Sequence, residues 1–189
     1  MGLFKPKKPK APLIDQNRLW IEESLDWLEK EFSDFPIEQI KTFVPTIEDF
    51  PLKFEETEDT AWTVVNIIAE AMEIDAEKID LKLFSNGVKE FRFGSSVTFV
   101  NLNEGETESA GTYIENDEGR FEISLDADIL SRGEKLIATV AHELCHVKLL
   151  GENRIEENDE YLTDLATVFF GFGIFSANSS FEVYNNNES

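Results

Sequence analysis

The residues best suited to chemistry in this chain are His142, Glu143 and His146, which form an H-E-x-x-H motif. On a helix, side chains four residues apart share one face, so the two imidazoles point the same way. Two neutral imidazoles at this spacing can bind one Zn²⁺ ion. The chain has only two histidines, and because both lie in the motif, a chance pairing on an exposed helix is disfavoured. The sequence therefore predicts a zinc site.

Glu143 follows the first histidine and is rotated from it by about 100° on a helix. Its carboxylate is therefore not expected to coordinate the ion that the histidines bind. It can instead reach a water molecule in the open coordination position of a catalytic zinc. This placement predicts a general base.

A catalytic zinc needs a third protein ligand, which must be a carboxylate or Cys145 because the chain has no other histidine. Cys145 lies on the same turn as the histidines, and its short side chain is expected to pack rather than to coordinate. Glu160 and Asp164 are the best carboxylate candidates. They lie four residues apart on one face of a following helix, and a helical hairpin would bring them over the histidines.

The motif followed by Glu160-Tyr161-Leu162-Thr163-Asp164 resembles the gluzincin class of zinc metallopeptidases, in which an HExxH helix precedes a helix carrying E-x-x-x-D. The chain is also similar to cytoplasmic proteases of the ImmA/IrrE type and to uncharacterised bacterial HExxH proteins. The resemblance covers about residues 131–177. It implies that Glu160 is the third zinc ligand, that Asp164 orients His142, and that a zinc-activated water hydrolyses peptide bonds with Glu143 as general base. A ligating imidazole usually donates its other N–H to such a carboxylate.

The chain departs from the gluzincin pattern in two ways. Residues 147–159, between the motif and Glu160, form a shorter connection than in the large gluzincins, and no histidine remains to stabilise the tetrahedral oxyanion. The candidates for that role are Tyr113, Tyr161, Tyr184 and Arg154. Peptide deformylases also use HExxH, but they need an upstream cysteine ligand that this chain lacks.

A function of a different class is also compatible with the motif. The metal could be a structural staple in a non-catalytic protein-binding module, with the acidic surface and the tryptophan-bearing N-terminal helix contacting a partner. A purely structural site would not need Glu143, which favours the enzyme.

Hydrophobic periodicity predicts an α+β fold. A small antiparallel or mixed sheet is expected to pack against the helix of the histidines and the helix of Glu160, with N-terminal helices preceding them. Asp15 is expected to cap a helix that carries an apolar stripe, and Thr57 to cap a second. Alternation with period two predicts strands at 79–83, 91–93, 97–102, 112–115 and 121–125, with hairpins at Asn86-Gly87 and around 116–119. An edge strand near 97–102 could align an extended peptide.

The boundaries of the two site helices are predicted from their caps. Ser131 and Glu134 form a capping box for the helix of the histidines, and Gly151 is a natural end for it. The next helix is expected over about 157–175. Gly171 and Gly173 are costly inside a helix, so either another backbone packs closely there or the helix ends early.

The chain is expected to divide into a disordered basic tail (1–12), a helical prefix (13–56), a metallopeptidase-like domain (57–178) and a flexible tail (179–189). A formal charge of −22 argues against nucleic acid as a partner, and no apolar run is long enough to cross a bilayer. A peptide or protein substrate is expected, with no indication of an oligomeric state. The single cysteine and the lack of a signal-peptide core favour the cytoplasm.

Overall fold

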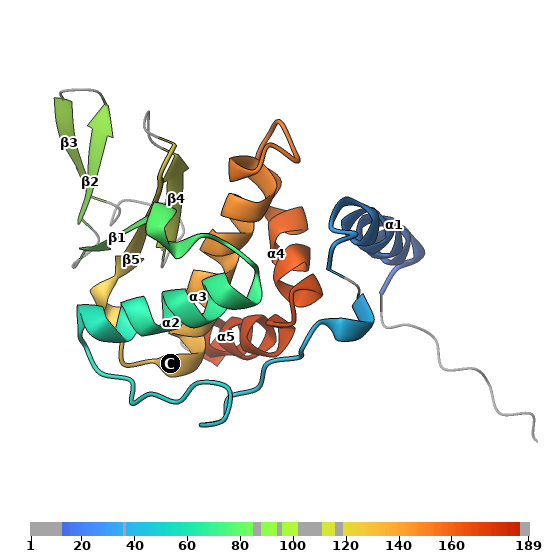
Figure 1. Cartoon of the computed structure of the whole chain (residues 1–189), viewed down its shortest axis with the longest axis horizontal. Helices are drawn as coiled ribbons and strands as arrows, with labels where there is room; N and C mark the ends of the chain where they lie inside the picture. Colours follow the sequence, from blue (N-terminus) through green and yellow to red (C-terminus); the bar gives the residue numbers. More distant parts are fainter. Residues whose placement is uncertain are drawn as a thin grey trace, which may run out of the picture.

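A computed structural model describes residues 13–35, 37–84, 88–93, 96–101, 111–115 and 119–185; for 88–93, 96–101 and 181–185 it gives the backbone alone. These residues form the predicted α+β fold, with five α-helices and a three-stranded mixed sheet (Figure 1). The helix α3 (Gly133–His146) lies between the sheet and the helix α4 (Glu160–Phe169). The predicted metal ligands, Glu143 and Asp164 all lie on these two helices.

The three-stranded sheet has the order β1-β5-β4. β5 (Phe121–Asp126) pairs in parallel with β1 (Ile79–Phe84) and antiparallel with β4 (Gly111–Glu115). Alternate residues of β5 (Phe121, Ile123 and Leu125) are buried, as expected for a strand with one face on the core. The antiparallel pairing of 112–115 with 121–125 was predicted and is confirmed, and β4 forms one edge of the described sheet.

The predicted hairpin at Asn86-Gly87 is wrong in its pairing. β1 pairs with β5, which follows it by some forty residues, and β2 (Val88–Phe93) pairs with β3 (Ser96–Asn101) in a separate two-stranded ladder. Residues 85–87 themselves lie outside the described part of the chain. A local turn signal cannot report a parallel partner, because parallel pairing needs a long crossover connection.

The helices α2 (Glu58–Ala71) and α3 bury their apolar faces together. The predicted cap of α2 is confirmed, since the Thr57 hydroxyl accepts a hydrogen bond from the Thr60 amide at 3.2 Å. The predicted capping box of α3 is wrong. The N-cap of α3 is Arg132, without a side-chain cap, and the Ser131 hydroxyl donates to Glu56 at 3.2 Å. Glu134 accepts from Asn178 instead, so longer-range partners replace the local box.

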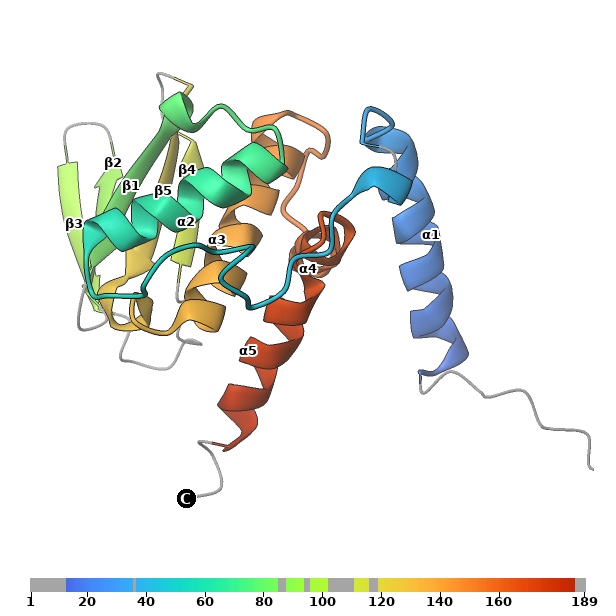
Figure 2. The same ribbon diagram turned by 60° about the horizontal axis from the view of Figure 1, so that its bottom comes forward.

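The helix α1 (Asp15–Glu31) lies beside α4, away from the sheet (Figures 1 and 2). Asp15 is its first helical residue and makes no cap, contrary to the prediction; the N-cap is Ile14, without a side-chain cap bond. Of the expected apolar stripe, Leu28 and Phe32 are buried, and both belong to the core shared with α2 and α3. The segment predicted as a helical prefix therefore packs on the same core as the rest.

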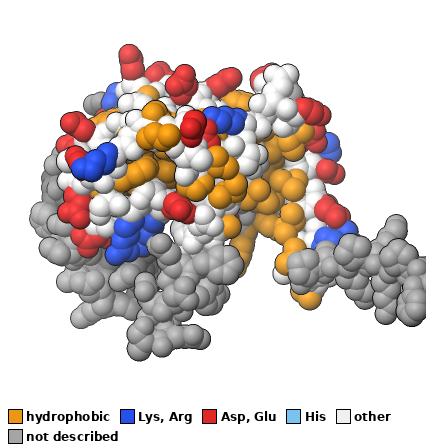
Figure 3. Space-filling view, turned by 90° about the horizontal axis from the view of Figure 1, so that it is seen from below, with side chains coloured by type: hydrophobic (Ala, Val, Ile, Leu, Met, Phe, Trp, Pro, Cys, Tyr) orange, Lys and Arg blue, Asp and Glu red, His pale blue; other side chains and the backbone are white. Residues whose placement is uncertain are grey.

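Hydrophobic side chains remain exposed along α1. Leu19 and Trp20 are 49% and 38% exposed, and apolar surface is visible on the face seen in Figure 3. Trp20 makes an edge-on contact with Tyr161 of α4, with ring centroids 6.3 Å apart. At the other end of α1, the Arg154 guanidinium donates to the Glu31 carbonyl at 2.7 Å. Among the described residues no helix is long and apolar enough to cross a membrane.

The helix predicted over 157–175 is two helices. α4 ends at Phe169, and α5 runs from Gly173 to Asn185. Gly171 between them has a φ of +90°, and a Cβ there would lie 2.0 Å from the Lys41 carbonyl oxygen. Both alternatives raised by the sequence therefore hold, because another backbone packs closely and the helix ends early.

The ends of the neighbouring segments also differ from the sequence expectations. α3 continues into one π-helical turn, Val147–Gly151, whose C-cap is Glu152. Gly151 is the last helical residue and not the predicted C-cap, so the prediction is off by one residue. The flexible tail was expected from residue 179, but α5 continues to Asn185. Residues 186–189 lie outside the described part.

Candidate metal centre

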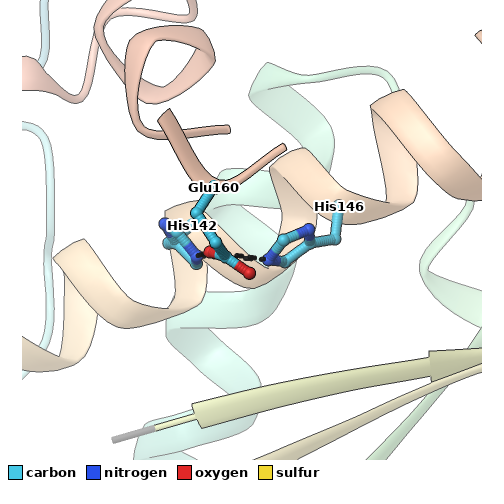
Figure 4. A group of neighbouring side chains, drawn as sticks. All are labelled: His142, His146 and Glu160. Carbon is cyan, nitrogen blue, oxygen red and sulfur yellow. Dashed lines mark hydrogen bonds and ion pairs between the residues drawn. The ribbon is translucent and has the colours of Figure 1, made fainter. Parts of the chain in front are cut away.

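The structure brings together the three residues predicted as metal ligands. His142 and His146 project from α3, and the Glu160 carboxylate points between their imidazoles (Figure 4). The two Nε2 atoms are 3.1 Å apart, and Glu160 Oε2 lies 3.1 Å from His142 Nε2 and 3.7 Å from His146 Nε2. We call these three residues the metal cluster. Its donor atoms all lie within 4.8 Å of one another, close enough to bind one ion.

The donor set suits zinc. Two imidazole nitrogens and one carboxylate oxygen are ligands that Zn²⁺ accepts, and three protein ligands leave a position open for water. Without an ion, the two facing nitrogens, 3.1 Å apart, can share one N–H···N hydrogen bond in which one ring donates and the other accepts. An ion bound to both lone pairs would replace that hydrogen bond.

The two sides of the metal cluster are positioned by different means. The regular turn of α3 sets the spacing of the histidines, and the core on its apolar face fixes the helix. Glu160 is placed by the start of α4, where Asp159 Oδ1 accepts a hydrogen bond from the Leu162 amide at 3.0 Å and caps the helix. The Glu160 carboxylate, in the first turn of α4, therefore lies at the positive end of the helix dipole.

Asp164 contacts the outer nitrogen of His142, as the resemblance implies. Its Oδ1 lies 3.0 Å from His142 Nδ1. When Nδ1 carries the proton and donates it to Asp164, the Nε2 lone pair points into the metal cluster. Asp164 lies one turn after Glu160, so both carboxylates reach the same imidazole from one helix face.

His146 has a different environment. Its ring stacks on Tyr113 of β4, with centroids 5.9 Å apart and an interplanar angle of 20°. His146 Nδ1 and the Tyr113 hydroxyl are both buried, and neither has a hydrogen-bond partner in the described structure. Burial, together with the charge of Glu115, raises the pKa of Tyr113 to about 12, so this hydroxyl keeps its proton.

The two histidines also differ in basicity. Burial lowers the pKa of His142, but its hydrogen bond with Asp164 and the surrounding carboxylates outweigh burial, so that pKa is raised above 6.5. Burial, followed by the charge of His142, lowers the pKa of His146 to about 4. A single proton on the pair therefore belongs to His142, and His146 is neutral at neutral pH.

Glu143 lies next to the metal cluster without joining it. It is 4% exposed and stands against β4, where a Cβ on Gly111 would lie 2.7 Å from Glu143 Oε1. Two cavities, of about 490 and 430 Å³, both border on Gly111, His142 and Glu143. The Glu143 carboxylate is thus at the junction of two spaces that a substrate could occupy.

The structure does not single out one of the predicted candidates for oxyanion stabilisation. Tyr113 lines the smaller cavity, but its hydroxyl is buried. Tyr161 is 78% exposed and packs against Trp20, and Arg154 bonds Glu31 and Glu152. The side chain of Tyr184 lies outside the described part.

Two other site expectations have clear outcomes. Cys145 is fully buried in the core, as predicted for a packing residue, and burial raises the pKa of its thiol well above the usual range. The strand near 97–102 was expected to be an edge strand that could align a peptide. β3 pairs with β2 in the two-stranded ladder, and the strands that pack on α3 are β4 and β5, with β4 the closer of the two.

Sequence reasoning missed two residues of the site, Gly111 and Asn158. Gly111 allows β4 to approach Glu143, and Asn158 donates from Nδ2 to Glu160 Oε1 at 2.6 Å. Neither belongs to a spaced motif, so only the tertiary structure reveals them.

The chain was also compared with known proteins. Searches of protein-family models, curated proteins and solved structures find no match. The function of the metal cluster therefore has to be inferred from its own geometry.

Proposed function

We propose that this chain is a zinc-dependent peptidase in which the metal cluster binds Zn²⁺ and Glu143 is the general base. The observation that carries the proposal is the convergence of His142, His146 and Glu160 beside a buried Glu143 that is not one of the three. A structural site would need the three ligands but not this neighbour. The resemblance to the gluzincin pattern supports the same assignment.

Each residue has a defined task in this proposal. Zinc bound at the cluster would supply Lewis-acid polarisation of a water molecule and of the scissile carbonyl. Glu143 accepts the proton of the attacking water and passes it to the leaving amine. Asp164 accepts a hydrogen bond from the Nδ1–H of His142 at 3.0 Å, which fixes the tautomer and the orientation of this imidazole.

A peptide is the substrate class that best suits the surroundings. β4 is an edge strand of the described sheet and packs on α3, so an extended peptide can add to it through main-chain hydrogen bonds. Gly111 on this strand lies beside Glu143, which brings a bound backbone amide close to the general base. The two cavities that border on Gly111 leave room for substrate side chains.

The charge of the chain supports a protein rather than a nucleic-acid partner. With 39 acidic and 17 basic residues, the formal net charge is −22, which repels phosphate backbones. A cytoplasmic location stays a prediction from the cysteine content and the N-terminal sequence.

The alternative is a non-catalytic protein-binding module with a structural metal. The exposed Leu19 and Trp20 of α1 favour it, because aromatic and aliphatic side chains on a surface are typical of interfaces. The two functions differ in what they require of Glu143.

Replacement of Glu143 by glutamine tests the proposal. Glu143→Gln keeps the shape and can still hydrogen-bond a water, but it cannot accept a proton. Zinc content and thermal unfolding should match wild type, while cleavage of a peptide library should fall by roughly 10²- to 10⁴-fold. Glu134→Gln, at the start of the same helix, is the matched control and should retain activity.

Two results would contradict the peptidase. Zinc-loaded wild-type protein that cleaves no member of a broad peptide library would point to the binding module. Full activity of Glu143→Gln would show that this glutamate does not activate water.

A further inference from the structure

The two oxygens of the Glu160 carboxylate have different partners. Oε2 faces the two imidazoles, at 3.1 and 3.7 Å from their Nε2 atoms. Oε1 accepts a hydrogen bond from Asn158 Nδ2 at 2.6 Å. The contact with Asn158 therefore turns one oxygen away from the metal cluster and the other toward it.

This contact matters because the Glu160 side chain is largely open to water. Its side chain is 61% exposed, and a glutamate free in water samples many rotamers, so fixing it costs up to about 2 kcal/mol. The neighbouring Asp159 caps α4 at 3.0 Å, which fixes the backbone between Asn158 and Glu160. The Asn158 amide is consequently held at the edge of the metal cluster, where it also lines the smaller cavity.

We propose that Asn158 is a positioning residue for the third metal ligand. It acts through Glu160 as Asp164 acts through His142, by bonding the ligand atom that does not face the metal. An amide is suited to this task because it donates a hydrogen bond without adding a charge that would compete for the carboxylate. This inference rests on the proposed metal site and extends it to a residue outside the HExxH and E-x-x-x-D patterns.

The test compares three variants by competition for Zn²⁺ with a chromophoric chelator. Asn158→Ala removes the donor and should weaken zinc binding by roughly 10- to 100-fold, the loss typical of residues that hold a ligand in place. Asn158→Asp keeps the size, removes the donor and sets a second negative charge against Glu160, so its affinity should be no higher than that of Asn158→Ala.

Asn178→Ala is the matched control, since Asn178 also donates its side-chain amide to a glutamate, Glu134 Oε2, at 2.6 Å, and Glu134 is not one of the three residues of the metal cluster. It should bind zinc as wild type does. The unfolding temperatures of metal-free Asn158→Ala and Asn158→Asp should match wild type. A purely structural role of Asn158 would instead lower the unfolding temperature.

The outcomes separate this inference from the proposed function. If wild type binds no zinc, the metal site itself is wrong. If wild type binds zinc and Asn158→Ala binds it equally well, Asn158 does not position Glu160. Tighter binding by Asn158→Asp than by wild type would also overturn the inference, because it would mean that added negative charge, and not the donated hydrogen bond, governs affinity at this position.

Discussion

The two helices that form the metal cluster hold their ligands in opposite ways. On α3, the side chains of His146 and His142 are 8% and 24% exposed. Packing therefore encloses His146, while His142 also depends on its contact with Asp164. On α4, the side chains of Glu160 and Asp164 are 61% and 69% exposed and are held only by polar contacts. A single hydrogen bond contributes about 1 kcal/mol. The carboxylate side is therefore the more adjustable half of the site, and the histidine side is the more rigid half.

The largest effect is expected from removing a ligand on either side. His146→Ala and Glu160→Ala should each reduce bound zinc from about one ion per chain to nearly none by elemental analysis. In the absence of metal, the two variants should differ in their free energy of unfolding. His146→Ala empties a buried position and should lower the free energy of unfolding by about 1–2 kcal/mol, whereas Glu160→Ala should change it by less than about 0.5 kcal/mol. Equal destabilisation by both would break the comparison.

The next effect concerns the turn that places α4 and α5. Gly171→Ala puts a Cβ 2.0 Å from the Lys41 carbonyl oxygen at a φ of +90°, so the free energy of unfolding should fall by about 3 kcal/mol or more. Gly119→Ala is the control, because Gly119 has a φ of +71°, but among the described residues, apart from its chain neighbours, no atom lies within 4 Å of an added Cβ. It should cost only about 1 kcal/mol. Denaturant unfolding measures both, and equal losses would mean that the contact with Lys41 is unimportant.

A smaller effect is expected from the outer partner of His142. Asp164→Ala should weaken zinc binding by roughly 10- to 100-fold, and Asp164→Asn should recover part of the loss because its carbonyl still accepts from Nδ1. Both affinities can be measured by chelator competition. A greater loss for Asp164→Ala than for Glu160→Ala would show that the two carboxylates have exchanged roles.

The smallest effect is the pH dependence of zinc affinity. Zinc must displace any proton from the imidazoles. The pKa of His142 is raised above 6.5, while that of His146 lies near 4. Between pH 6.5 and pH 5, zinc binding should therefore release one proton, from His142. The zinc affinity should fall about tenfold for each unit by which the pH is lowered. Two ordinary histidines would cost up to about a hundredfold per unit in this range, and such a slope would contradict the asymmetry between them.

Several features of the fold were predictable because they are encoded locally. The Thr57 cap depends on a contact three residues away, and the pairing of β4 with β5 joins strands that are neighbours in the chain. Local signals failed where a distant partner intervened. Ser131 bonds Glu56 instead of capping α3, and β1 pairs with β5 instead of with the strand that follows it.

The sequence by itself determined the histidine half of the site. The helical repeat sets both imidazoles on one face and Glu143 to the side of it, and no distant contact is needed for that. Only the tertiary structure decided the carboxylate half. The spacing of Glu160 and Asp164 gave them a common face, but their approach to the histidines depends on the turn before α4 and on the close passage of Gly171 over Lys41. The contact of Asn158 with Glu160 and of Gly111 with Glu143 likewise joins side chains and backbones whose proximity no residue spacing encodes.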